Sequence, residues 1–444
     1  MADRLAVTGI LLLGGASSRF GSPKALARFR GETLAERAHR LLTEVCDEVI
    51  AVGKEADSLD VPFPVLDDGV EERASVYGVV AGLRAAAHET CIVLPVDCPR
   101  LTPELLRRLV EAKAVPQTGP LPGVYERTML AELEQRISRG ELSLRGVNGL
   151  VLDLDEALLV NANTRMELMA TAVADWASER EDIKALLLVG SQARTDAPAD
   201  RWSDLDLIFL VEDPGRYTED ASWVHEFGAP LVTFLEATPD GHWERRVLFE
   251  TGEDVDFVLF PAAIVERLDQ SAGAADLLAR GYRVLIDRIG LGDSFARLAA
   301  KPGPRVDPSQ HELTELASDF WYHALWISKK LRRGEVYTAV DCLDGYLKSR
   351  FVTLLSWHAR AVDPAADTWH AGRFLERWAD PGALVALEFA YARYSLREVA
   401  YALWQSIDLW QGIEKETARR LGLALELDHV ELRRRVAEVV PDPR

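Results

Sequence analysis

The fold of the middle of this chain is decided by the sequence VGSQAR at residues 189–194, followed by SDLDL at residues 203–207. Residues 185–189 are apolar and predict a buried strand that runs into a Gly-Ser turn. A second strand is predicted from Asp204, and because side chains alternate along a strand, Asp204 and Asp206 project from one face. Neighbouring carboxylates repel each other unless a cation lies between them, and Mg²⁺ prefers such oxygen ligands. The spacing therefore predicts a magnesium site beside a glycine turn.

The residues around this pair of aspartates suit a bound triphosphate. Gly190 and Ser191 offer backbone N–H groups and a hydroxyl near the expected start of a helix, and Arg194 adds positive charge. A third acid, Asp256, lies on a later predicted strand, where it could bind a second metal ion or accept a proton. Either half of the pattern alone is also typical of an ordinary turn or of solvated aspartates at a strand end. Their order along one chain favours a site for nucleotidyl transfer.

A second glycine-rich signature follows the first apolar strand. The sequence GGASSRFGSPK occupies residues 14–24. The glycines, Gly14 and Gly15 first among them, let the backbone approach an anion, and Arg19 and Lys24 supply charge. The loop lacks the GK[ST] ending of a Walker A motif and the spacing of the GxGxxG fingerprint. It is interpreted as a phosphate-binding loop of another kind.

Asp97 follows the apolar strand predicted at residues 90–96. An aspartate in this position is, on its own, more often a helix or turn cap. The C-terminal ends of parallel strands, however, form the rim where doubly wound sheets bind ligands. Because the glycine-rich loop lies upstream, the metal-ligand interpretation of Asp97 is favoured.

Strands alternate with helices in the first part of the chain, which predicts a parallel sheet covered by helices. The strands are expected at residues 7–13, 48–52, 90–96 and 151–154, and helices at 33–44 and 103–112. A helix at 166–178 is expected to lead into a second set of strands, at 185–189, 204–211, 231–235, 247–250 and 254–260. The predicted fold class is α/β, beginning with a doubly wound Rossmann-like domain.

The last part of the chain is predicted to be helical. Pro302-Gly303-Pro304 marks a boundary, and Asp307 or Ser309 is expected to cap the first helix. Aromatic side chains at helical spacing are expected to lie mostly in the core. They are Phe320, Trp321, Tyr322, Trp326, Trp357, Trp404 and Trp410. The domains are therefore expected at residues 1–168, 169–304 and 305–444.

Composition excludes some partners. The chain of 444 residues carries 71 acidic and 51 basic residues, a net charge of −20, which argues against a general nucleic-acid partner. An acidic cleft would concentrate a cationic small substrate, although acidic charge also keeps proteins soluble. The four cysteines show no zinc spacing and suggest no disulfide framework. With neither a signal segment nor a membrane span predicted, we expect a cytoplasmic protein without a membrane partner.

Residues 1–168 resemble the MobA-like nucleotidyltransferases, which include molybdenum-cofactor guanylyltransferase. The resemblance is carried by LGGASSRFGSPK at 13–24, GVVAG at 78–82, LPVDCP at 94–99 and NANTRMEL at 161–168. The resemblance implies that GTP or CTP phosphates contact Gly14, Gly15, Arg19 and Lys24, and that Asp97 and Asn163 hold Mg²⁺. Two departures concern the loop that would contact the base. YGV at 77–79 replaces the usual Gly-Pro-Leu, and the stretch around residues 116–123 is short.

Residues from 169 onward resemble the aminoglycoside 6-adenylyltransferases, the streptomycin-modifying type. The matching motifs are GSQAR at 190–194, SDLD at 203–206, DVD at 254–256 and DFWY at 319–322. The resemblance implies a polymerase-beta-like domain that binds MgATP, a helical domain that closes the substrate cleft, and a role in antibiotic resistance. Asp319, Glu335 and Asp344 are then candidates to pair with the ammonium or guanidinium groups of an aminoglycoside-like acceptor. For Glu335 the alternative is a surface residue beside Arg333.

The two resemblances together predict a bifunctional nucleotidyltransferase. Adenylyl transfer would use Asp204, Asp206 and Asp256 with Mg²⁺. Two alternatives are kept: guanylyl or cytidylyl transfer to a molybdopterin-like or other phosphate by the N-terminal domain as the main activity, and a nucleotide or metabolite sensor without turnover. The presence of all the expected carboxylates counts against the sensor.

Overall fold

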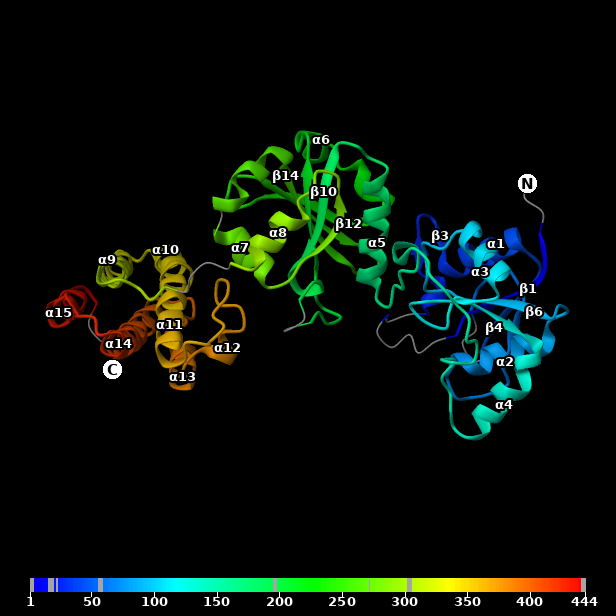
Figure 1. Ribbon diagram of the computed structural model, residues 1–444. Coiled ribbons are helices and arrows are strands. Elements are labelled where there is room, and N and C mark those ends of the chain that lie inside the picture. The colour runs from blue at the N-terminus through cyan, green and yellow to red at the C-terminus, as the bar shows by residue number, and fades with distance from the viewer. Residues whose placement is uncertain are drawn as a thin grey trace. The chain divides into compact units, whose positions relative to one another are not determined.

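The computed structural model describes residues 4–14, 20, 23–54, 59–194, 198–270, 272–301 and 306–440. The chain divides into two compact units, residues 1–303 and 304–444. The first unit contains two large β-sheets, and the second is a helical bundle (Figure 1). Each unit is described by itself below.

The first sheet is doubly wound, as expected. Its strands lie in the order β5 (Val65–Asp67), β4 (Cys46–Gly53), β1 (Leu5–Leu12), β6 (Thr90–Pro95) and β8 (Gly123–Glu126), and β8 alone of these runs antiparallel to its neighbour. The strand order reverses at β1, so that the C-terminal ends of β1 and β6 flank a topological switch point, the usual ligand position in such sheets.

Helices cover both faces of this sheet (Figure 1). Helices α1 (Leu34–Val45) and α3 (Pro103–Ala112) contribute to one hydrophobic core, and α2 (Ser75–Ala85) and α4 (Leu130–Ser138) to the other. The starts of α1 and α3 follow from local chemistry, since Thr33 and Thr102 cap them with their side chains. Residues 151–154 were predicted as a strand of this sheet. Instead β9 (Val151–Leu152) pairs with β7 (Val115–Pro116) in a separate two-stranded ribbon.

The second sheet is mixed. Its order is β12 (Pro230–Ala237), β13 (Trp243–Phe249), β14 (Asp254–Pro261), β11 (Leu205–Val211), β10 (Ile183–Val189) and β15 (Arg283–Asp287). Strands β11 and β14 are parallel, and the other neighbours are antiparallel. Helices α7 (Ala272–Ala279) and α8 (Gly292–Ala299) pack on one face of it. The predicted strands are present, β12 and β13 being longer than expected, whereas β15 was not predicted.

Helix α5 (Arg165–Ser178) belongs to the cores of both sheets. Thr164 and Glu167 form a capping box that fixes its first turn. Leu168 lies in a core of the first sheet, and Met169 and Val173 lie in a core of the second. The domain boundary expected between residues 168 and 169 therefore falls inside one helix.

The second unit is helical, as predicted. It contains α9 (Gln310–Arg332), α10 (Val336–Val340), a π-helix η9 (Asp341–Leu347), α11 (Lys348–Val362), α12 (Leu375–Trp378), α13 (Pro381–Ala390), α14 (Leu396–Leu421) and α15 (His429–Val439). Ser309 caps α9. Phe320 and Trp410 stack in the core, with ring centroids 4.1 Å apart. Tyr322, one of the aromatic residues expected to lie mostly in the core, is 67% exposed, because its neighbour Trp321 takes the buried face of the helix.

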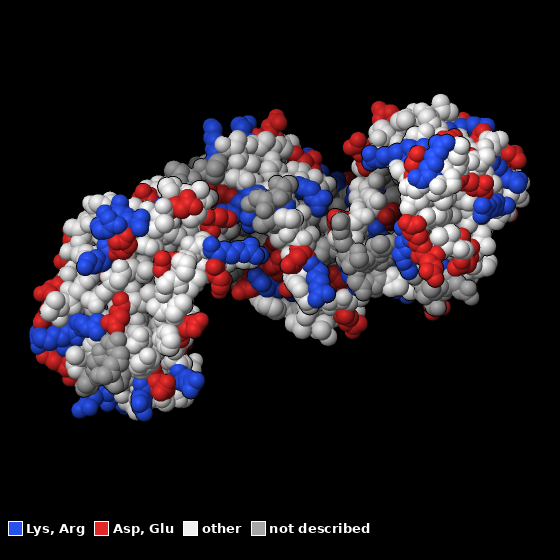
Figure 2. All heavy atoms as spheres, turned by 90° about the horizontal axis from the view of Figure 1, so that it is seen from below, with Lys and Arg blue, Asp and Glu red and all other residues white. Residues whose placement is uncertain are grey.

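The short elements of the first unit are β2 (Arg28–Phe29), β3 (Glu32–Thr33), α6 (Gly215–Thr218) and the 3₁₀ turns η2 (Lys24–Leu26), η4 (Arg127–Met129), η5 (Glu156–Leu158), η6 (Gly190–Gln192), η7 (Ser222–Glu226) and η8 (Ala262–Gln270). On the face shown in Figure 2, basic and acidic side chains are interspersed. Among the helices of the described residues, none is long and apolar enough to cross a membrane.

Candidate active sites

Three aspartates come together on the second sheet. Asp204 precedes β11, Asp206 lies in it, and Asp256 lies in β14. Strands β11 and β14 are parallel neighbours in which Asp206 and Asp256 are register partners. Carboxylate oxygens of the three residues all lie within 4.8 Å of one another. Among the described residues this is the one group of three or more acidic, histidine or cysteine side chains that could hold a metal ion.

Asp256 is the buried member of this triad, and its Oδ1 has no hydrogen-bond partner among the described residues. Burial, together with the nearby charges of Glu244 and Asp206, raises the pKa of Asp256 to about 7. Arg246 opposes them through an ion pair of 3.5 Å to Oδ2. An oxygen without a hydrogen-bond partner, next to two further carboxylates, is suited to bind a divalent cation, because such cations prefer hard oxygen donors.

The glycine turn lies against the triad. Gly190 has φ +67°, and a Cβ built on it would stand 1.9 Å from Oδ2 of Asp206, so that only glycine lets the turn approach this closely. The Ser191 hydroxyl is buried and has no partner among the described residues, and the Gln192 amide donates to the carbonyl of Asp204 at 3.3 Å. We expected the start of a helix here. The structure has the single 3₁₀ turn η6 instead, so the backbone N–H groups that we expected to face phosphate lie in one turn.

A second cluster of polar side chains lies at the switch point of the first sheet. Gly14 follows β1 and Asp97 follows β6. The Lys24 ammonium lies 3.0 Å from Oδ2 of Asp97 and 3.4 Å from the Asn163 amide oxygen. The structure thus brings together three of the predicted residues from three distant segments. Two further predicted residues, Gly15 and Arg19, lie outside the described residues.

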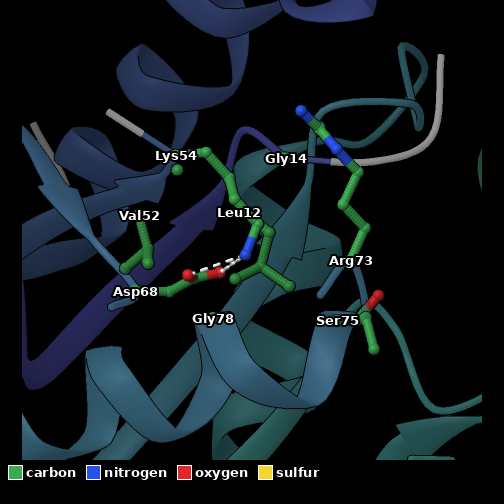
Figure 3. A pocket seen from close by; sticks show the side chains of 10 residues that line it. Leu12, Gly14, Val52, Lys54, Asp68, Arg73, Ser75 and Gly78 are labelled. Atoms are coloured by element: carbon green, nitrogen blue, oxygen red, sulfur yellow. Dashed lines mark hydrogen bonds and ion pairs between the residues drawn. The ribbon is translucent and has the colours of Figure 1, made fainter. Parts of the chain in front are cut away.

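A cavity of about 150 Å³ opens beside Gly14 (Figure 3). Lys54 and Asp68 point toward each other on one wall, with Lys54 Nζ 2.8 and 2.9 Å from the two carboxylate oxygens. Both side chains are nearly buried, being 9% and 7% exposed. Arg73 and Ser75 stand on the other side of the cavity (Figure 3). Sequence reasoning missed these four residues, because they belong to no spaced motif.

The three acids predicted to bind an acceptor lie in the helical unit, and each has its own partners. Asp319 accepts from the Tyr346 hydroxyl and pairs with Arg350 and His323, at 2.9 and 2.7 Å. Glu335 pairs with Lys330 at 2.8 Å and with Arg333 at 2.7 Å.

Asp344, the third of these acids, accepts from the backbone N–H of Ala392 and lies 3.6 Å from Lys348. Burial lowers the pKa of Lys348 to about 8. Lys348 also contacts the Ser406 hydroxyl at 3.2 Å, so the structure gives Asp344 contacts inside the bundle.

Two family models match different parts of the chain. The family model for streptomycin adenylyltransferase matches residues 164–436, which is more than half of the chain. The chain belongs to the streptomycin adenylyltransferase family. The model for the MobA-like NTP transferase domain matches residues 9–149. Both are nucleotidyltransferase families, so this streptomycin adenylyltransferase family member is an enzyme of that class with two such domains.

Relatives of each half are known. An aminoglycoside 6-adenylyltransferase of Bacillus subtilis is 28% identical over 195 residues, 41% of this chain and 65% of the relative, so the chain spans less than two thirds of that protein. A probable molybdenum cofactor guanylyltransferase of Aquifex aeolicus is 32% identical over 176 residues, 36% of this chain and 88% of the relative. The crystal structure of a Bacillus subtilis aminoglycoside 6-adenyltransferase is 17% identical, with a TM-score of 0.30, over 62% of this chain and 98% of that one.

Proposed function

We propose that the C-terminal half transfers AMP from MgATP to a hydroxyl of an aminoglycoside-like acceptor. The observation that carries this proposal is the triad of Asp204, Asp206 and Asp256, whose buried member keeps an oxygen without a hydrogen-bond partner among the described residues. The Ser191 hydroxyl, in the glycine turn, likewise has no partner among those residues. An excess of buried negative charge is unfavourable unless a cation shares the site. The family match supports the class of acceptor.

Each residue of this site has a role in the proposed transfer. Asp204 and Asp206 would hold Mg²⁺, which neutralises charge on the triphosphate and on the leaving pyrophosphate. The Ser191 hydroxyl and the N–H groups of η6 donate to phosphate oxygens, and Arg194 adds positive charge there. The acceptor hydroxyl attacks the α-phosphorus. The bond between the α-phosphorus and the oxygen that bridges to the β-phosphate breaks, and pyrophosphate leaves. The hydroxyl proton passes to Asp256. A pKa of about 7 suits Asp256 to this exchange.

The acceptor would be recognised by the acids of the helical unit, Asp319, Glu335 and Asp344. A polycationic acceptor would replace the cationic side chains that now pair with Asp319 and Glu335, so that no carboxylate is left unpaired. Asp344 is held by contacts inside the bundle, so of the three acids it is the least able to exchange its present partners for those of an acceptor.

We propose that the N-terminal half binds a second nucleotide, GTP or CTP, and transfers its nucleotidyl group to a phosphate acceptor. Lys24 would contact the phosphates, together with Gly14, Gly15 and Arg19, and Asp97 and Asn163 would hold Mg²⁺. The cavity beside Gly14 would receive the base, with the Lys54–Asp68 pair offering both a hydrogen-bond donor and an acceptor. The gathering of Lys24, Asp97 and Asn163 at the switch point supports this second activity.

One experiment tests both proposals. The purified full chain is incubated with Mg²⁺, each of the four NTPs, and streptomycin or a metabolite extract, and nucleotidylated products are identified by mass spectrometry. An ATP-dependent adenylyl adduct on streptomycin that is absent in Asp204→Asn supports the C-terminal proposal. A GTP- or CTP-dependent product that persists in Asp204→Asn makes the N-terminal site the main activity. Nucleotide-induced thermal stabilisation without any product contradicts both and indicates a sensor.

A further inference from the structure

Arg165 contacts elements of both candidate nucleotide sites. Its Nε donates to the carbonyl of Phe20 at 3.1 Å, and its Nη1 donates to the carbonyl of Thr251 at 3.2 Å. The same Nη1 forms an ion pair of 3.0 Å with Glu253, and the guanidinium lies over the Phe20 ring, 5.8 Å from its centroid. The Arg165 side chain therefore links the start of α5 to the segment of Phe20 and to the turn at residues 251–253, all inside the first unit.

On the N-terminal side, Arg165 is next to the residues proposed to bind phosphate and metal. Phe20 lies in the glycine-rich segment between Gly14 and Lys24. Asn163, two residues before Arg165, has its amide oxygen 3.4 Å from the Lys24 ammonium. A ligand that changes the position of Lys24 or Asn163 thus acts directly on the segment that carries Arg165.

On the C-terminal side, Arg165 contacts the turn that leads into β14. Thr251 and Glu253 form this turn, the Thr251 hydroxyl donates to Glu253, and β14 then carries Asp256 three residues later. The Glu253 side chain is 7% exposed, so its carboxylate depends on internal partners. A shift of the Arg165 guanidinium consequently changes the position of the turn that precedes the third carboxylate of the triad.

The space around Arg165 also supports transmission along this route. A cavity of about 610 Å³ borders Phe20, Arg165, Gln192 and Glu253, which leaves room for the guanidinium to change partners. Gln192, which lines this cavity, is hydrogen-bonded to the backbone of Asp204, a member of the triad.

We propose that Arg165 is a positioning residue that couples the two nucleotide sites. When a nucleotide and Mg²⁺ bind at Lys24, Asp97 and Asn163, the hydrogen bonds of Arg165 to Phe20 and Glu253 change together, and the turn before β14 moves relative to Asp206. The affinity of the C-terminal site for MgATP changes as a result, and by thermodynamic reciprocity MgATP changes the affinity of the N-terminal site by the same factor. The coupling rests on the proposed nucleotide binding at both sites.

Hydrogen exchange on the full chain tests the coupling. The C-terminal site is disabled with Asp204→Asn and Asp206→Asn, and Mg²⁺ with GTP or with CTP is added. Exchange is followed in residues 90–99, at the N-terminal site, and in residues 247–258, around the turn. The same measurement is made with Arg165→Met, with the conservative Arg165→Lys, and with Arg100→Met. Arg100 is the control, because its ion pair with Asp175 in α5, at 2.6 Å, is a contact to the same helix that differs from the contacts of Arg165 to Phe20 and Glu253.

We expect nucleotide to slow exchange in 90–99 and to change exchange in 247–258 by about fivefold or more, the lower end of typical allosteric couplings. The second change is lost in Arg165→Met, partly restored in Arg165→Lys and retained in Arg100→Met. Protection of 90–99 without any change in 247–258 overturns the coupling and leaves the proposed nucleotide site standing. A change in 247–258 that survives Arg165→Met overturns the role of Arg165. Absence of any effect at 90–99 with either nucleotide overturns the N-terminal binding proposal as well.

Discussion

The two candidate nucleotide sites balance the charge of their carboxylates in different ways. At the N-terminal site Asp97 is already paired with Lys24, at 3.0 Å. At the C-terminal site three carboxylates lie within 4.8 Å of one another, and Asp256 keeps an oxygen without a partner among the described residues. A site with an internal cation tolerates the absence of metal, whereas a cluster of like charges depends on a cation from solution. The comparison teaches that divalent metal should matter more to the C-terminal half.

Replacement of Asp204 gives the largest expected effect. We expect Asp204→Asn to lower adenylyl transfer by about three orders of magnitude or more, because bound metal supplies several kcal/mol of transition-state stabilisation. The measurement is the rate of adduct formation with MgATP and streptomycin. The exposed Asp240, in the turn between β12 and β13, provides the control Asp240→Asn, which should retain the wild-type rate. Wild-type turnover in Asp204→Asn would refute the assignment of the metal site.

The parallel change at the other site is Asp97→Ala. We expect pyrophosphate release with GTP or CTP to fall by about two orders of magnitude or more, because the metal ligand is lost while Lys24 still attracts phosphate. Adenylyl transfer by the C-terminal half should change far less, by no more than the coupling through Arg165 allows. If Asp97→Ala abolished both reactions equally, the two sites would not be the separate centres described above.

Substitution of one glycine at each candidate site tests the difference between the two sites by steric crowding. Gly190→Ala places a methyl group 1.9 Å from the Asp206 carboxylate at a positive φ, whereas Gly14→Ala meets no atom of the described residues within 4 Å. We expect Gly190→Ala to reduce adenylyl transfer by about 10- to 100-fold, since a displacement near 1 Å costs about that much. Gly14→Ala should leave adenylyl transfer unchanged. Both rates are measured on chains whose circular dichroism and melting temperature confirm folding, and equal losses in the two variants would contradict the close approach of Gly190 to the triad.

The smallest expected effect concerns pH. Protons and metal ions compete for Asp256, whose pKa is about 7, so the proton is held below pH 7 and released above it. We expect the apparent affinity for Mg²⁺ to rise by up to about tenfold per pH unit between pH 5 and 7 and to level off above pH 7. Calorimetric titration in the Asp97→Ala background isolates the C-terminal site. The rise should be weaker in Asp256→Asn, and a wild-type profile that is flat across this range would mean that the charge of Asp256 does not contribute to metal binding.

The sequence predicted those parts of the structure that depend on local pattern. The helices expected at residues 33–44 and 166–178 are present as α1 and α5, and Asp204 and Asp206 lie close together, as the strand period of two predicts. The Lys54–Asp68 pair could not be predicted, because the two residues are separated in sequence and meet only when β4 and the segment after β5 are folded. Asp344 shows the same limit, since its partner Ala392 lies 48 residues away.

Some predictions were wrong because they rested on which residue types are present and not on the direction in which each side chain points. Tyr322 follows two buried aromatic residues in α9, yet its own direction around the helix carries it to the surface. The first strand residues of β13, Trp243 to Arg246, are mostly polar, so their pairing with both β12 and β14 left no apolar pattern to detect. Strand β15 pairs with β10 at the sheet edge and is similarly partly exposed.

Helix α5 has a consequence for how the first unit melts. Leu168 fills one hydrophobic core and Val173 another, so neither sheet can lose its packing without stripping one side of the same helix. We therefore expect residues 1–303 to denature in a single calorimetric transition, with no intermediate in which one sheet survives alone. The same sharing makes α5 a poor place to divide the gene: a cut between residues 168 and 169 would leave each fragment with part of a helix and an uncovered apolar face.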